Sequence, residues 1–333
     1  MPPRLSTRLA SPAIRLIRLY SSDVAPLVRV TNLPAPNTGH VRILELNRPD
    51  ARNALSKALV TALRAEIDKV RGQYTGDGQE LPPPRRFGGA AGVDQKGPTR
   101  ALIVASAIDT SFCAGADLKE RRGFTQEETK QFLKDLRNTF TALACVPIPT
   151  ISAVSSLAFG GGLELALCTH FRVLASTAMV GLPETRLGII PGAGGTYRLR
   201  SVIGPQRARD LIVTGRRVAA QEAYFLGLAD RLVEVLPEDE RDAVAQEETA
   251  ENREANEDGL PTRARKAALS EAVRLAFEIC EGAPIAIRTA LQAVAWARSE
   301  IEDSLYEKVV TTEDRNEGLI AFHEKRKPVF KGR

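Results

Sequence analysis

Two glutamates stand out because each lies in apolar or glycine-rich sequence. Glu164 is part of FGGGLELALC (159–168), and Glu184 is part of GLPETRLGIIPGAGGT (181–196). A carboxylate in such surroundings is costly unless it is well paired or takes part in chemistry. Two carboxylates around one water molecule suit acid–base catalysis, because one can accept a proton while the other donates. Either glutamate alone is more often a favourable partner of a helix dipole.

Three glycines precede Glu164 and open an apolar helical run. Without side chains, they leave backbone N–H groups unobstructed at a helix N-terminus, where the macrodipole favours negative charge. The segment therefore predicts an anion or oxyanion site. Neither it nor PGAGGT has the GK[ST] ending of a phosphate loop, and no dinucleotide fingerprint follows a strand. ATP and NAD are not expected as cofactors.

Composition excludes several other classes of protein. The four cysteines form no CxxC pair and only three histidines are present, so neither a zinc site nor a disulfide framework is expected. We expect the cysteines to be small buried hydrophobes. No apolar run approaches the roughly 18 residues that span a bilayer, so no transmembrane segment is predicted.

Basic charge is concentrated in residues 1–22. The chain has 46 basic and 41 acidic side chains, and this leader contributes four arginines and no acid, which leaves 46 − 4 = 42 basic residues against 41 acidic ones elsewhere. An Arg-rich, Ser-containing and acid-free leader is typical of a mitochondrial transit peptide, although a disordered basic tail is the alternative. The prediction is a protein of the mitochondrial matrix.

The elements that position the glutamates follow an α/β pattern. HVRILELN alternates like a strand, and NALSKALVTALRAEIDKVR has apolar residues at helical spacing. TRALIVASA and PTISAVSSLAFG are continuous apolar runs that predict buried strands, and HFRVLAST predicts a further short one. Alternating strands and helices indicate an α/β core over residues 40–235, with right-handed crossovers.

Two segments interrupt this pattern. Residues 72–98 are rich in Gly and Pro and lack periodicity, so they are interpreted as a mobile surface insertion. Residues 236–266 are acidic and poor in large apolar side chains, which predicts a solvated helix or linker. The helical patterns KAALSEAVRLAFEIC and IAIRTALQAVAWA then make 236–333 a mainly helical C-terminal region.

Four segments taken together resemble the crotonase superfamily, the enoyl-CoA hydratase and isomerase family. They are NRPDARNAL, SFCAGADLKE, FGGGLELALC and GLPETRLGIIPGAGGT, in this order. The resemblance covers residues 41–72 and 99–333. It implies a spiral core of ββα repeats, C-terminal helices that associate into a homotrimer or hexamer, an acyl-CoA thioester substrate, and no separate cofactor or metal.

The resemblance also implies roles for individual residues. The backbone N–H groups of Ala116 and Gly161 would form an oxyanion hole for the thioester carbonyl. Glu164 and Glu184 would hold the water that adds to C3, and Glu184 would exchange the proton at C2. Further contacts to CoA are implied for Ala114, Asp117, Leu118 and Lys119, and for Lys325 and Lys327 against a neighbouring subunit's CoA.

Within the family, ETRLGIIPGAGGTYRL and the ending TEDRNEGLIAFHEKRKPVFKGR are more similar to the methylglutaconyl-CoA hydratases of leucine degradation. Short-chain enoyl-CoA hydratases of fatty-acid oxidation are the alternative. An RNA-binding role is a third hypothesis, because that branch includes an AU-rich RNA-binding member. The matching helix offers only Lys57, Arg64 and Lys69, and these cations fit a solvated face equally well.

Overall fold

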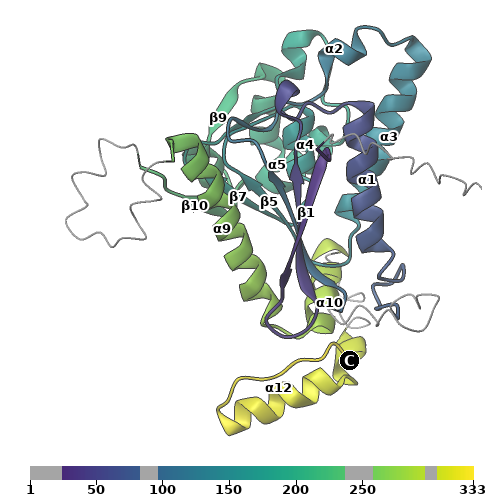
Figure 1. Ribbon diagram of the computed structural model, residues 1–333, viewed down its shortest axis with the longest axis vertical. Helices are drawn as coiled ribbons and strands as arrows, with labels where there is room; N and C mark the ends of the chain where they lie inside the picture. Colours follow the sequence, from purple (N-terminus) through teal and green to yellow (C-terminus); the bar gives the residue numbers. More distant parts are fainter. Residues whose placement is uncertain (1–24, 83–96, 237–257, 297–305) are drawn as a thin grey trace, which may run out of the picture.

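The computed structural model describes residues 25–82, 97–236, 258–296 and 306–333 (Figure 1). The strands are β1 (Val28–Pro34), β2 (His40–Leu46), β3 (Thr99–Ser106), β4 (Ser111–Cys113), β5 (Thr150–Val154), β6 (Leu157–Phe159), β7 (Phe171–Ala175), β8 (Met179–Gly181), β9 (Arg217–Ala219) and β10 (Arg231–Val233). The helices are η1 (Pro49–Ala51), α1 (Lys57–Arg71), α2 (Leu118–Arg121), α3 (Gln126–Ala144), α4 (Gly161–Ala166), η2 (Pro183–Leu187), α5 (Gly195–Thr214), α6 (Ala220–Phe225), α9 (Leu260–Cys280), α10 (Pro284–Trp296) and α12 (Glu313–Glu324).

Two sheets form the core of the fold. The larger has the strand order β1-β2-β3-β5-β7-β10, and all its pairs are parallel except the antiparallel pair of β1 and β2. The smaller has the order β4-β6-β8-β9, with only β9 antiparallel. PTISAVSSLAFG therefore forms two strands rather than one, because a bend at residues 155–156 separates β5 in the first sheet from β6 in the second.

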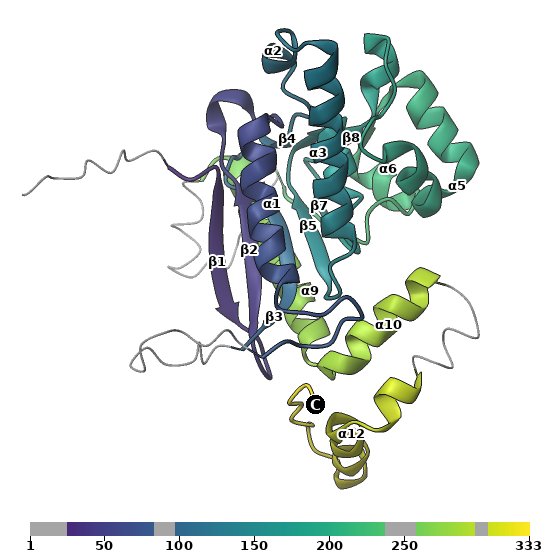
Figure 2. The same ribbon diagram turned by 90° about the vertical axis from the view of Figure 1, so that its right-hand side faces the viewer.

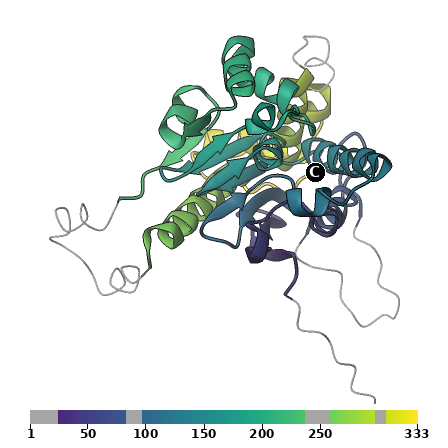
Figure 3. The ribbon, with the colours of Figure 1, turned by 90° about the horizontal axis from the view of Figure 1, so that it is seen from above.

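Helices cover both faces of the larger sheet (Figure 1, Figure 3). Strand side chains alternate between the faces, as the pleat requires. Val41 and Ile43 of β2 pack against the alanine-rich side of α9, whereas Leu44 and Leu46 belong to the core that includes α1 and α3. The predicted strand in TRALIVASA is confirmed, since every residue of β3 is buried.

The first part of the predicted insertion is not a mobile surface loop. Residues 72–82 fold back through a bridge between Tyr74 and Glu80, and the buried Tyr74 hydroxyl donates to the backbone oxygen of Thr99 at 2.5 Å. The segment lacks periodicity because a few separate contacts hold it, among them those of Gln73, Tyr74 and Glu80, and no amphipathic face is required. Residues 83–96 lie outside the described part of the chain.

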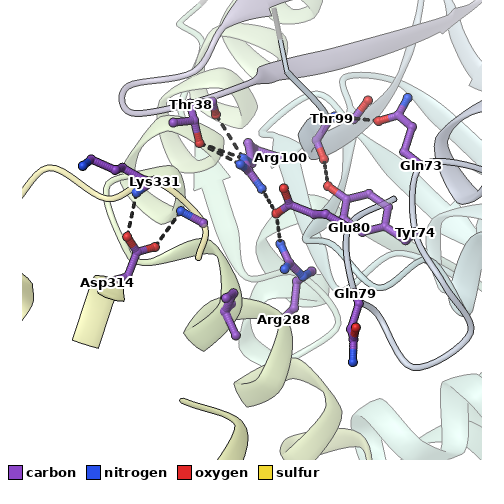
Figure 4. Close-up of polar contacts among 12 residues, drawn as sticks. Thr38, Gln73, Tyr74, Gln79, Glu80, Thr99, Arg100, Arg288, Asp314 and Lys331 are labelled. Atoms are coloured by element: carbon purple, nitrogen blue, oxygen red, sulfur yellow. Dashed lines mark hydrogen bonds and ion pairs between the residues drawn. The ribbon is translucent and has the colours of Figure 1, made fainter. Parts of the chain in front are cut away.

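A cluster of ions joins this turn to the C-terminal region (Figure 4). Glu80 Oε1 accepts hydrogen bonds from Arg100 of β3 and, at 2.7 Å, from Arg288 of α10. Both arginine side chains are buried, and Arg100 also donates to Thr38. Gly332 lies against the same cluster, where an added Cβ would be 2.9 Å from Arg100 Nη2.

The C-terminal helices are confirmed, but they play different parts in this chain. Helix α9 is part of the core, whereas α10 and α12 lie toward the lower end of the molecule in Figure 2. Asp314 of α12 is buried and accepts from the backbone N–H groups of Lys331 and Gly332 at 2.6 and 2.7 Å, which fixes the final residues. In the described part of the chain, no helix is long and apolar enough to cross a membrane.

Candidate active site

The two glutamates of the sequence analysis line one cavity of about 570 Å³. Glu164 projects from α4 and Glu184 from η2, and their side chains meet the cavity beside Gly160 and Gly161. Apolar side chains of α3 and of residues 187–190 complete its walls. This arrangement brings together residues that are 20 positions apart in the chain.

Glu164 is held by its hydrogen bonds. Its Oε1 accepts from the backbone N–H groups of Ala193 and Gly195 at 2.7 and 2.8 Å, and only 2% of the residue is exposed. Burial raises the pKa of Glu164, while the two N–H groups and the nearby Arg198 and Arg137 oppose that shift. The PGAGGT segment therefore orients a carboxylate.

Glu184 is held differently. Its Oε2 is buried and has no hydrogen-bond partner among the described residues. Burial raises the pKa of Glu184 to about 7, and the neighbouring Glu164 adds to that increase. Such a carboxyl group is poised to give or take a proton near neutral pH.

Two backbone N–H groups face the same cavity. Gly115 has a left-handed φ of +94°, and an added Cβ there would lie 2.7 Å from the Phe159 oxygen, so only glycine allows this approach. The approach brings Ala116 beside Gly161, where the Ala116 nitrogen is 3.8 Å from the position of an added Gly161 Cβ. Within the described residues, neither N–H donates a hydrogen bond to the protein.

The other predicted contact residues divide into two groups. Ala114 and Leu118 line the cavity. Asp117 does not line the cavity. Its carboxylate caps α2 and pairs with Arg48 at 2.7 Å. The hydrogen bond from the Glu120 N–H, together with Arg48, lowers the pKa of Asp117. Lys119 is also absent from the cavity wall. Lys325 and Lys327 follow α12, where Lys327 pairs with Glu281 at 3.5 Å and remains 90% exposed.

Comparison with known proteins decides the family. The enoyl-CoA hydratase/isomerase family profile matches residues 91–251. A protein of Pyricularia oryzae named methylglutaconyl-CoA hydratase 1, mitochondrial, is 63% identical over 99% of this chain and 95% of its own length. The chain belongs to the enoyl-CoA hydratase/isomerase family. An enoyl-CoA isomerase/hydratase of Zymoseptoria tritici is 53% identical, over 94% of this chain and 91% of that protein.

The fold agrees with that of a solved member of the family. The crystal structure of an enoyl-CoA hydratase from Bacillus anthracis superposes with a TM-score of 0.72 and 34% identity, covering 92% of this chain and all of that one. The predicted crotonase-like α/β fold is thus confirmed.

Sequence reasoning missed two cations of this enoyl-CoA hydratase/isomerase cavity. Arg121 of α2 and Arg137 of α3 both line it. Arg137 Nε donates to the backbone oxygen of Gly192 at 2.6 Å, next to the residue whose N–H holds Glu164. Neither arginine lies in a glycine-rich motif, so only its position in space marks it.

The cysteines and histidines provide no competing site. All four cysteines are free; three are buried as predicted, but Cys145 is exposed at the end of α3. In the described ranges, no group of three or more potential metal ligands comes together.

Proposed function

We propose that this protein is a 2-enoyl-CoA hydratase that adds water across the C2–C3 double bond, with 3-methylglutaconyl-CoA as its substrate. The arrangement that carries the proposal is a pair of buried glutamates facing one cavity with two unpaired N–H groups. Two carboxylates suit hydration, because water must lose one proton while C2 gains another. The name of the Pyricularia oryzae relative supports the choice of acyl group.

In the proposed reaction, the thioester oxygen accepts hydrogen bonds from the N–H groups of Ala116 and Gly161. These donors stabilise the negative charge that develops on that oxygen as electrons leave the C2–C3 double bond. A water oxygen bonds to C3 and gives a proton to Glu164, while protonated Glu184 gives a proton to C2. The thioester carbonyl re-forms, and a proton passes from Glu164 back to Glu184 before the next turnover.

Contacts with the CoA part of the substrate follow from the cavity wall. Ala114 and Leu118 line it and are proposed to lie along CoA. Asp117 and Lys119 would support the CoA path indirectly, through the position of α2. Lys325 and Lys327 lie on the C-terminal segment. They are proposed to contact the CoA that is bound to a neighbouring subunit. No separate cofactor is proposed.

Turnover by the purified protein tests the reaction and the acyl group together. Crotonyl-CoA and 3-methylglutaconyl-CoA are compared under identical conditions by the loss of enoyl-thioester absorbance. A clear preference in kcat/KM for 3-methylglutaconyl-CoA supports the full proposal. A preference for crotonyl-CoA favours the short-chain alternative, and hydration of neither compound overturns the assignment.

Mitochondrial localisation is part of the proposal. It rests on the composition of residues 1–22, which lie outside the described part of the chain, and on the word "mitochondrial" in the name of the Pyricularia oryzae relative. We expect the leader to be absent from the mature protein in the matrix. N-terminal sequencing of protein from isolated mitochondria checks this, and an intact Met1 would contradict it.

A trimer or hexamer is proposed because large apolar side chains are exposed on α10 and α12. Val294, Trp296 and Phe322 are 79%, 62% and 86% exposed. Exposed apolar surface of this kind is typical of association sites. Light scattering at micromolar concentration should give three or six times the mass of one chain, and a monomeric mass would contradict the proposal.

A further inference from the structure

The cavity holds an unused cation close to the proposed reaction centre. Arg137 lines the cavity, and among the described residues its one hydrogen bond runs from Nε to the Gly192 oxygen at 2.6 Å. That bond fixes the plane of the guanidinium group. Its two terminal nitrogens have no hydrogen-bond or ion-pair partner among the described residues, so they remain available to a ligand.

The charge of Arg137 already acts on Glu164. It is one of the two arginines that act against the burial-induced rise in the pKa of Glu164. The other, Arg198, donates from Nη1 to the Ala193 oxygen at 2.8 Å and does not line the cavity. Arg137 is thus the cation that faces both the cavity and the segment holding Glu164.

An acyl group that carries a distal carboxylate needs such a cation. In a glutaconyl thioester, the carboxylate carbon is only two bonds beyond C3, the carbon that Glu164 and Glu184 would serve. The substrate carboxylate would bring a further negative charge into a cavity that already contains the ionised Glu164. Like charges in that setting repel strongly, unless a positive charge is placed beside the new one.

We propose that Arg137 determines specificity by binding the distal carboxylate of a dicarboxylic enoyl thioester. Its planar fork matches the two oxygens of a carboxylate and allows a bidentate contact. This inference rests on the proposed hydratase function. Arg121 is less suitable, because it lies one helical turn beyond the Ala116–Leu118 side of the cavity, whereas Arg137 adjoins the Gly192–Ala193 segment beside Glu164.

The test measures kcat/KM of Arg137→Gln and wild type with crotonyl-CoA and 3-methylglutaconyl-CoA. We expect the ratio of kcat/KM for 3-methylglutaconyl-CoA to that for crotonyl-CoA to fall 10- to 100-fold, the usual range for a hydrogen bond to a charged group. Any loss that is common to both substrates reports the effect of Arg137 on Gly192 and Glu164. Arg137→Lys should recover part of the loss. Lys134→Gln is the matched control, because it removes a cation from the same helix without touching the cavity wall.

The outcomes separate this inference from the proposed function. An equal loss with both substrates would show that Arg137 only holds the Gly192 segment, and would overturn the specificity role. A selective loss in Arg121→Gln instead would also overturn it. Wild-type hydration of crotonyl-CoA without the carboxylated compound would refute the inference while the hydratase activity stands. Hydration of neither substrate would refute the function itself.

Discussion

Glu80 is partly buried and Glu184 is buried, and the surroundings of the two carboxyl groups differ in kind. Glu80 Oε1 lies between two buried arginines and accepts a hydrogen bond from each. Glu184 has a buried oxygen with no hydrogen-bond partner among the described residues. The charged group that shifts its pKa is another carboxylate, that of Glu164. The first environment pairs a carboxylate with two cations, whereas the second raises the pKa of Glu184 to about 7.

By this contrast, Glu80 stabilises the fold, whereas Glu184 takes part in catalysis. Removing Glu80 should damage folding, because its arginines would then face each other without compensation. Removing the acid–base capacity of Glu184 should damage turnover and leave the fold intact.

Glu184→Gln and Glu164→Gln should each lower kcat for hydration by about 10² to 10⁴. Glutamine keeps the size of the side chain and can hydrogen-bond water, but it cannot exchange a proton. If the two groups act as a unit, the double variant should be little slower than the slower single one. Steady-state rates and thermal midpoints are measured on the same samples. Wild-type turnover in either single variant would remove that glutamate from the mechanism.

Glu80→Gln should reduce the free energy of unfolding by about 3 kcal/mol, at the lower end of the range for breaking a buried ion pair, because Glu80 remains partly exposed. Denaturant unfolding measures the loss. The rate per folded molecule should stay near that of wild type, since Glu80 does not line the catalytic cavity. Unchanged stability would show that the two arginines find other compensation.

The role of each glutamate can be predicted from sequence only where the residues that surround it are close to it in the chain. Glu164 and Glu184 lie in motifs whose glycines allow close approach of neighbouring backbone segments. Residues adjacent in the sequence therefore indicate the site. Glu80 lies in a Gly- and Pro-rich stretch, and its partners are 20 and 208 positions away. Arg100 lies in a run that was interpreted as continuously apolar, so no local signal marked it as a partner of Glu80.

The same reasoning explains the other differences. The positions of the strands could be predicted from the apolar runs. No local pattern indicates that β5 and β6 belong to different sheets, because that depends on which strands lie beside them. Arg137 could not be identified from sequence, since a cation on an amphipathic helix is usually solvated. Its contact with Gly192, 55 positions away, sets it apart.

The pH profile should show the protonation of Glu184. Because protonated Glu184 is required for hydration, kcat/KM should fall as pH rises above about 7, and it should also fall in acid as Glu164 loses its charge. The reverse reaction needs the same pair of glutamates with one proton between them, so its kcat/KM should follow the same pH profile. A hydration profile flat from pH 6 to 9 would contradict the proposed role.

Stability should depend on the same proton. A pKa near 7 in the folded state, against an ordinary 4.5, means that the folded protein binds the proton more tightly. The contribution of Glu184 to stability therefore declines as pH rises from about 4.5 to 7, and Glu184→Gln should remove this decline. The variant should gain at most about 3 kcal/mol over wild type at pH 8 relative to pH 4.5. Parallel urea titrations at the two pH values provide the comparison.

The smallest effect is expected from the exposed cations of α1, the helix considered for RNA binding. Arg64 pairs with Asp68 at 2.7 Å, and Lys57 pairs with Glu128 at 3.5 Å and lies 4.2 Å from the centre of the Phe124 ring. Exposed ion pairs of this kind contribute about 0 to 1 kcal/mol. Replacing both cations by alanine should therefore change stability by less than about 1 kcal/mol and leave hydration near wild type.

Because Lys57, Arg64, Lys69 and Arg71 all form ion pairs with acidic side chains, α1 offers little unpaired positive charge to a phosphate backbone. Any RNA affinity should be weak and should fall steeply with added salt. Filter binding of an AU-rich RNA at two salt concentrations measures it for the wild type and for the Lys57→Ala, Arg64→Ala double variant. Tight binding that is insensitive to salt would contradict this electrostatic account, and a large loss of hydration in the variant would place α1 within the catalytic machinery.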